Sequence, residues 1–111
     1  MKKNRMDLMM VEIIEIVKST RDSGQKEYAH NEKDVFANFN RVSELLEIPR
    51  QKVLYTYLLK HIDGIAAYTK GHTSQREDVT GRITDAIVYL MLLWAMIEED
   101  ERGATRGREG W

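Results

Sequence analysis

The sequence contains no cysteine and a single proline among its 111 residues. Without cysteine, the chain cannot form disulfide bridges, thiolate zinc sites or a cysteine nucleophile. It also has no glycine-rich phosphate loop and no nucleophile triad motif, which excludes the enzyme classes that depend on them. Any chemistry must therefore come from carboxylates, amides, histidine and basic side chains.

A basic surface and a long apolar run are also missing. The chain carries 17 basic and 18 acidic residues, for a formal net charge of −1. Proteins that bind duplex nucleic acid usually present a basic face, so we do not expect duplex binding. The longest uncharged apolar run, residues 86–97, has twelve residues, which is short of the ~20 that a membrane-spanning helix needs. We expect a soluble, cytoplasmic protein with no membrane segment.

The sequence does contain enough apolar residues for one core. Hydrophobic residues make up 42% of the chain, and this length is the common size of a single domain. Residues 1–101 are expected to form that domain. Residues 102–111 are rich in glycine and arginine and lack apolar periodicity, so we expect a flexible C-terminal tail there.

Apolar residues recur at helical spacing in four segments, residues 6–20, 31–48, 50–68 and 76–99. The repeat at i, i+3, i+4 and i+7 is typical of amphipathic helices. Polar breaks separate the segments, and Pro49 suits the first turn of the third helix. The predicted fold is therefore all-α, a four-helix bundle-like single domain. The side chains expected to face its core include Val42, Leu45, Leu46, Leu54, Leu58 and Ile62.

The last predicted helix is apolar on all sides over residues 86–97. A helix of this kind must be covered on all sides. Three other short helices can hardly enclose twelve apolar residues that include Trp94. We therefore expect a homodimer or a larger homo-oligomer.

Three polar residues interrupt the apolar stripes of the second and third helices. Asn38 shares a stripe with apolar neighbours, so it is either a buried amide that ties two helices together or an amide that orients a ligand. His61 lies on the inward stripe of the third helix, as a buried structural histidine or as a functional one. Lys60 stands at the edge of that stripe, where it can reach water or a phosphate.

The start of the last helix carries a second polar group. Asp78, Arg82, Asp85 and Tyr89 follow one another at helical spacing and share one face. Asp85 is either paired with Arg82 one turn earlier or is a ligand for a hard cation. Glu77 lies two turns before Asp85 and can join it in such a site.

Two further acids stand on the first helix. Glu12 and Glu15 are three residues apart and project side by side. Acids at this spacing can share a magnesium ion, although they can equally form a solvated edge. Both interpretations remain open from the sequence.

Three stretches recur in an order that resembles a known group of proteins. They are EYA (27–29) with DVFANF (34–39), then KHID (60–63), then Glu77 with GRITD (81–85) and Tyr89. Their order and spacing resemble small phage-borne helical proteins of the nucleotide-modification-associated type, over about residues 26–97. That group in turn resembles the MazG-like superfamily of all-α nucleoside triphosphate pyrophosphohydrolases.

The resemblance implies a magnesium-dependent nucleotide site. MazG-like enzymes hold Mg²⁺ with an E-x-x-E on one helix and an E-x-x-D on another, and they cleave nucleoside triphosphates between the α and β phosphates. Asp85 matches the aspartate of the second motif, but Arg82 stands where its glutamate is expected. Glu12 and Glu15 have the spacing of the first motif and lie outside the matched region.

Three functions follow from these patterns. The first is a Mg²⁺-dependent nucleoside triphosphate pyrophosphohydrolase, with Glu77, Asp85, Glu12 and Glu15 as metal ligands, Lys60, His61 and Arg82 as catalytic residues, and Asn38, Lys60, Arg82 and Tyr89 as substrate contacts. The second is a binding module that holds a nucleotide without cleaving it. The third is an assembly or regulatory protein whose last helix serves only for oligomerisation.

Overall fold

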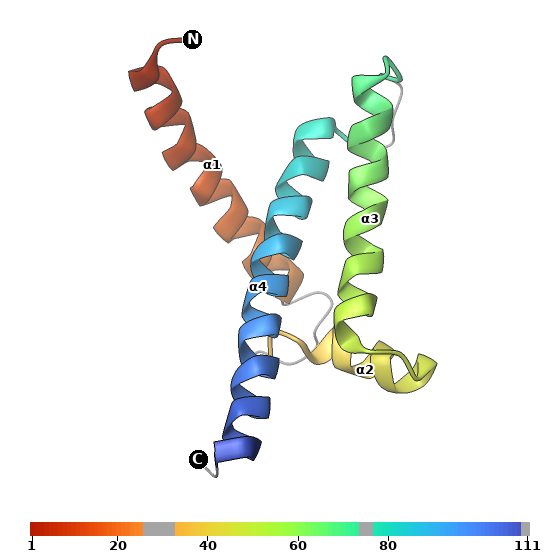
Figure 1. The fold of residues 1–111 in the computed structure, drawn as a ribbon. Helices are drawn as coiled ribbons and strands as arrows, with labels where there is room; N and C mark the ends of the chain where they lie inside the picture. The colour runs from red at the N-terminus through yellow and green to blue at the C-terminus, as the bar shows by residue number, and fades with distance from the viewer. Residues whose placement is uncertain (26–32, 74–76, 110–111) are drawn as a thin grey trace.

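The computed structural model describes residues 1–25, 33–73 and 77–109, with side chains up to Gly103. These ranges contain four helices and no strand (Figure 1). The helices are α1 (Lys3–Gly24), α2 (Ala37–Leu46), α3 (Arg50–Thr69) and α4 (Val79–Glu109). The prediction of an all-α chain with four helices is therefore confirmed.

The ends of three helices differ clearly from the prediction. The first helix was expected over residues 6–20, but α1 spans Lys3–Gly24. We expected the second helix to begin at residues 31–33, but α2 begins at Ala37. The carboxylate of Asp34 accepts the backbone N–H of Phe36 at 2.9 Å, which holds the chain in a turn before the helix. The last helix was expected to end near residue 99, but α4 continues to Glu109, into the segment predicted to be a tail.

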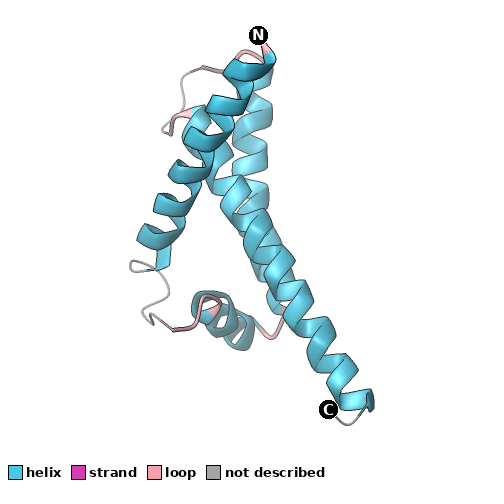
Figure 2. Ribbon diagram, turned by 90° about the vertical axis from the view of Figure 1, so that its left-hand side faces the viewer, coloured by secondary structure: helices cyan, strands magenta, loops and turns pink. Residues whose placement is uncertain are grey.

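The four helices are not aligned side by side as in a regular bundle. The helices α3 and α4 run antiparallel next to each other, and the short α2 lies across the lower end of α3 (Figure 1). The helix α1 packs against α4 obliquely, and in the turned view its C-terminal part diverges from the α3–α4 pair (Figure 2). The chain is elongated as a result, with a radius of gyration of 16.7 Å, against about 13 Å for a compact domain of this length.

The core lies where α2 meets the α3–α4 pair. Leu54 of α3 and Met96 of α4 are fully buried there. Around them pack the buried Phe36, Phe39 and Val53. Burial of these apolar side chains is the main source of stability at this end of the molecule.

Three side chains expected in the core are exposed instead. Leu45 and Leu46 lie at the end of α2, beyond the part of this short helix that crosses the α3–α4 pair. Ile62 is exposed as well, because it lies on the side of α3 that α4 does not cover. The periodicity correctly identified apolar faces but not how far the neighbouring helices extend over them.

The outer face of α4 is also uncovered. Leu90, Met91 and Ile97 are exposed, and Trp94 is 74% exposed. The described part of one chain therefore leaves this helix partly uncovered. The sequence predicted this, because the helix is apolar on all sides and the other helices are too short to enclose it. The segment Val79–Gly103 is also long and apolar enough to cross a membrane. Core helices of soluble proteins can meet the same criterion of length and composition.

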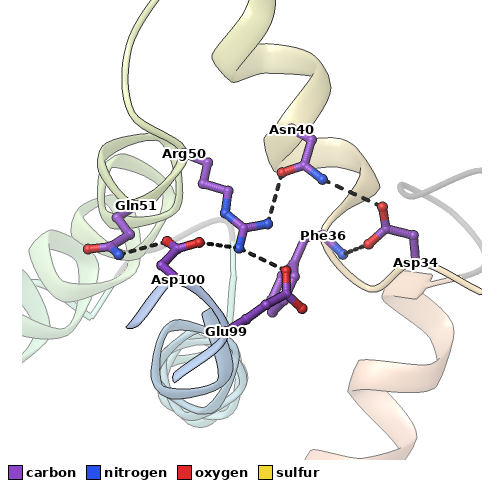
Figure 3. Close-up of polar contacts among 7 residues, drawn as sticks. All are labelled: Asp34, Phe36, Asn40, Arg50, Gln51, Glu99 and Asp100. Carbon is purple, nitrogen blue, oxygen red and sulfur yellow. Dashed lines mark hydrogen bonds and ion pairs between the residues drawn. The ribbon is translucent and has the colours of Figure 1, made fainter. Parts of the chain in front are cut away.

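A polar cluster joins α2, α3 and α4 beside the core (Figure 3). Arg50 donates hydrogen bonds to Asp100 at 2.6 Å, to Glu99 at 3.0 Å and to Asn40 at 3.2 Å. Its guanidinium also lies 5.0 Å from the centre of the Phe36 ring, a favourable cation–π distance. The sequence analysis did not single out this cluster, which fixes the first turn of α3 against α4.

Candidate functional site

A cleft of about 690 Å³ receives side chains from all four helices. Its walls include Ser19, Thr20 and Gln25 from the end of α1, Phe39 from α2, Tyr57 from α3, and Val88 and Leu92 from α4. Six of the residues predicted to form a site also line it: Asn38, Lys60, His61, Glu77, Asp85 and Tyr89. Residues far apart in the sequence therefore meet in one cleft.

Aromatic rings form one wall of this cleft. The rings of Tyr57 and Tyr89 lie 6.3 Å apart, centre to centre, and each also contacts the ring of Phe39. His61 stacks on Tyr89 at 5.6 Å with an angle of 27° between the rings. This wall gives the cleft an apolar aromatic surface beside its polar groups.

His61 is buried, as its place on the inward stripe of α3 predicted, with only 6% of its surface exposed. Its Nδ1 atom lies 3.7 Å from Oδ2 of Asp85, too far for a hydrogen bond. Among the residues that the structure describes, this buried nitrogen has no hydrogen-bond partner. A buried polar atom without a partner lowers the stability of the fold by about 1–3 kcal/mol. A ligand that binds this nitrogen would recover that loss.

Arg82 lies beside this pair and packs over Gly64 of α3. Its side chain is 14% exposed, and its Nη1 atom is 3.9 Å from Oε2 of Glu77. The close approach depends on glycine, since a Cβ atom at position 64 would lie 2.5 Å from Cδ of Arg82. In the described part of the chain, Nε of Arg82 is buried without a hydrogen-bond partner. Arg82 thus pairs weakly with Glu77, and among the described residues the nearest charged or titratable partner given for Asp85 is His61 rather than Arg82.

Three of these residues can hold a metal ion together. One donor atom each from His61, Glu77 and Asp85 lies within 4.8 Å of the other two. They combine one imidazole nitrogen with two carboxylates, whose charge can balance a divalent cation. The orphaned nitrogen of His61 points to the same conclusion, because a metal ion would supply its missing partner.

The other predicted metal ligands do not join this cluster. Glu12 and Glu15 are exposed on α1 and do not line the cleft. Glu15 lies 3.7 Å from the ammonium of Lys18 on its own helix. Asp78, which was predicted only to share a face with Arg82, accepts a hydrogen bond from the hydroxyl of Thr80 at the start of α4. A metal-binding role for Glu12 and Glu15 stays a prediction that this arrangement of one chain does not support.

Sequence analysis did not single out the cleft residues at the end of α1, Ser19, Thr20 and Gln25, nor Tyr57 and Gly64 of α3. Tyr57 looked like a core position, because it lies on an apolar stripe, yet it lines the cleft. Gly64 could have been recognised, since an isolated glycine inside a helical pattern often marks a close approach by another group.

No known protein family, no curated protein and no solved structure matches the chain.

Proposed function

We propose that this chain binds a nucleotide in the cleft and acts on its phosphates with the help of Mg²⁺, as a pyrophosphohydrolase of phage-type nucleotide metabolism. The observation that carries the proposal is the composition of the cleft. An aromatic wall, a lysine, a buried arginine and a cluster of metal-ligand type lie in or directly beside one space of about 690 Å³. Each of these groups suits a different part of a nucleotide.

The aromatic wall suits the base. A nucleobase can stack on Tyr89 or Tyr57, and such stacking contributes about 1–3 kcal/mol per base. Asn38 lines the same cleft, and its amide can hydrogen-bond the edge of a base. Its oxygen accepts a hydrogen bond from Arg41 at 2.8 Å, which orients the amide.

The charged end of the cleft suits the phosphates. Lys60 lines the cleft on α3, one residue before His61. Arg82 is held nearby by a contact of 3.9 Å to Glu77, and its planar guanidinium can grip phosphate oxygens through paired hydrogen bonds. Glu77 and Asp85 are the carboxylates that would hold Mg²⁺ at this end of the cleft.

The proposed hydrolysis uses this arrangement directly. A water attacks the α phosphorus, the bond to the bridging oxygen breaks, and pyrophosphate leaves. Lys60 and Arg82 are the side chains that can neutralise the negative charge that builds up on the phosphates, and a bound Mg²⁺ would supply further positive charge there. The proton that the attacking water loses can pass to a carboxylate oxygen of the cluster or to solvent in the cleft.

A second candidate is a module that binds the nucleotide and leaves it intact. The observation in its favour is Arg82, which stands where the resemblance to MazG-like enzymes leads us to expect a metal-binding glutamate. A guanidinium there lowers the affinity for a cation and raises that for a phosphate.

One experiment separates the two candidates. The purified protein is incubated with a panel of nucleoside and deoxynucleoside triphosphates, with and without Mg²⁺, and released pyrophosphate and bound nucleotide are both measured. Pyrophosphate that requires Mg²⁺ indicates the enzyme, and tight binding with intact nucleotide indicates the binding module. Lys60→Ala should weaken either activity, whereas Lys52→Ala, at an exposed position of the same helix, should not. If no nucleotide of the panel binds or is cleaved, the proposal is wrong.

We also propose that a second copy of the chain covers the outer face of α4 and the exposed side of α1. The chain exposes 8559 Å², about 2,200 Å² more than expected for a compact monomer of its mass. A stable dimer buries only about 800 Å² per partner. Trp94 and Leu90 of α4, with Leu8 and Val11 of α1, are exposed apolar side chains that such a partner would cover.

Light scattering tests this assembly. The expected result is a dimer or larger species at micromolar concentration that Trp94→Lys dissociates, with the matched change Tyr55→Lys, at an exposed aromatic residue of α3, having no effect. A 13.0 kDa monomer that instead sediments with lipid vesicles would show that a membrane covers α4.

A further inference from the structure

We infer that His61 is a third ligand of the cation site, and that the site therefore takes a first-row transition ion such as Mn²⁺ in preference to Mg²⁺. The inference rests on the proposed function for the use of the ion. The ion itself needs no nucleotide in order to bind, because all three ligands come from the chain.

The distance between His61 and Asp85 is the first support. Nδ1 of His61 and Oδ2 of Asp85 are 3.7 Å apart, which is too long for a hydrogen bond. Two metal bonds of about 2.0–2.2 Å span up to roughly 4.3 Å between their ends, so one ion fits between these atoms. The carboxylate of Glu77 completes a set within 4.8 Å, and it must move by about 1 Å or less to reach the same ion.

The setting of His61 is the second support. The His61 side chain is more than nine-tenths buried, with 8% of its surface exposed. Stacking on Tyr89 fixes the plane of the ring, so that Nδ1 stays directed at Asp85. A carboxylate can only accept a hydrogen bond, and at 3.7 Å it accepts none from this nitrogen. A metal ion bound between them would satisfy both atoms in their present positions.

The type of ligand decides which ion is preferred. Mg²⁺ favours oxygen ligands and near-octahedral geometry, and it usually keeps several waters. Imidazole nitrogen binds transition ions more strongly, in the order Mn²⁺ < Co²⁺ < Cu²⁺ along the series. Because one of the three ligands is an imidazole, the site gains more from a transition ion than from Mg²⁺.

Arg82 links this ion to the phosphates. Without an ion, its guanidinium stands 3.9 Å from the Glu77 carboxylate as a weak counter-charge. An ion that binds Glu77 takes over this role, which frees Arg82 to turn to a phosphate in the cleft. Arg82→Gln should therefore strengthen Mn²⁺ binding and weaken nucleotide binding.

Paramagnetic resonance of Mn²⁺ tests the inference on the full chain without nucleotide. We expect one Mn²⁺ per chain, held at least about tenfold more tightly than Mg²⁺, with a nitrogen coupling in the spin-echo spectrum. His61→Asn should weaken Mn²⁺ binding by more than about 100-fold and remove the coupling. His72→Asn changes an exposed histidine outside the cluster and should change neither.

Other outcomes would overturn it or bear only on the proposed function. Equal affinities for Mn²⁺ and Mg²⁺, or bound Mn²⁺ without nitrogen coupling, would show that His61 is not a ligand. The coupling in the unchanged protein decides the matter even where His61→Asn does not fold. Mn²⁺ bound with the coupling, but no nucleotide bound with either ion, would leave the metal site standing and remove the proposed function. If nucleotide binds with Mg²⁺ but bound Mn²⁺ shows no nitrogen coupling, the proposed function stands and His61 is not a metal ligand.

Discussion

The two ends of the α3–α4 pair each hold a mostly buried arginine, and the two arginines are bound very differently. Arg50 is 19% exposed and forms three hydrogen bonds of 2.6–3.2 Å. Arg82 is 14% exposed, yet its ion pair with Glu77 spans 3.9 Å, and its Nε has no hydrogen-bond partner in the described ranges. Buried polar groups are normally satisfied, so those left without partners often mark functional sites. The hydrogen bonds of Arg50 therefore stabilise the fold at one end, whereas the nitrogen of Arg82 left unpaired among the described residues indicates a ligand-binding site at the other.

The pKa values at the Arg50 end agree with this difference. Burial disfavours the charged form of Arg50, but the hydrogen bonds and charges of Asp100 and Glu99 outweigh it and raise the pKa of the guanidinium. The hydrogen bond from Arg50 lowers the pKa of Asp100 below 3.8. Each partner therefore stabilises the charged form of the other, which is the behaviour of a structural ion pair.

The largest expected effect is on the free energy of unfolding, and it reflects the different packing of the two ends. Leu54 is fully buried at the Arg50 end, so Leu54→Ala should lower the free energy of unfolding by about 3 kcal/mol. Ile62 lies on the same helix toward the other end and is exposed. Ile62→Ala should cost less than about 1 kcal/mol. Urea denaturation of both variants checks this contrast, and equal losses would contradict it.

The next effect concerns the arginines themselves. Arg50→Ala leaves two carboxylates and an amide without their donor, so it should lower the free energy of unfolding by about 2 kcal/mol. Arg82→Ala removes no close hydrogen bond among the described residues, and it should change that free energy by less than about 0.5 kcal/mol while weakening nucleotide binding. Thermal unfolding and a binding titration measure the two effects. A large loss of stability in Arg82→Ala would make Arg82 a structural residue as well.

A change at Gly64 tests the Arg82 end without removing a charge. In Gly64→Ala the new methyl group must displace Arg82, because it would lie 2.5 Å from Cδ. Alanine also favours the helix by about 1 kcal/mol, so stability should change by less than that. Nucleotide affinity should fall about tenfold, because the displaced guanidinium could no longer reach the phosphates in the proposed complex. Ser43→Ala, at a half-buried position of α2 that does not line the cleft, serves as the binding control.

The smallest effect is the pH dependence of the Arg50 end. Because the folded-state pKa of Asp100 is lowered, its contribution is fully present above pH ~4 and is lost as the pH falls through the lowered pKa. Asp100→Asn should be less stable at neutral pH and should lose less stability on acidification. Urea midpoints between about pH 5 and pH 2 measure this. Parallel pH profiles for both proteins would show that the pair does not contribute.

Local patterns predicted much of this molecule because they depend on neighbouring residues only. Helical spacing identified the four helices, and it placed His61 on the buried side of α3 and Asp85 on the same face as Tyr89. It could not show that Leu45 lies beyond the reach of α3 and α4, because that depends on how the helices cross.

Contacts between residues far apart in the chain could not be predicted from the sequence either, because they depend on how the helices pack. Arg50 meets Asp100 across 50 positions of the chain, and no spacing rule connects residues so far apart. The contact of Arg82 with Glu77 was missed because Glu77 lies before α4 begins, so its direction is set by the turn and not by the helical period. The pairing of His61 with Asp85 required the packing of α3 on α4.

The most direct test of the site at the Arg82 end is an anomalous difference map from crystals grown with Mn²⁺. The metal-site proposal predicts one peak about 2.0–2.2 Å from Nδ1 of His61 and from a carboxylate oxygen of Asp85, with Glu77 turned toward it. A peak between Glu12 and Glu15 on α1, or no peak in the cleft at saturating Mn²⁺, would contradict the proposal.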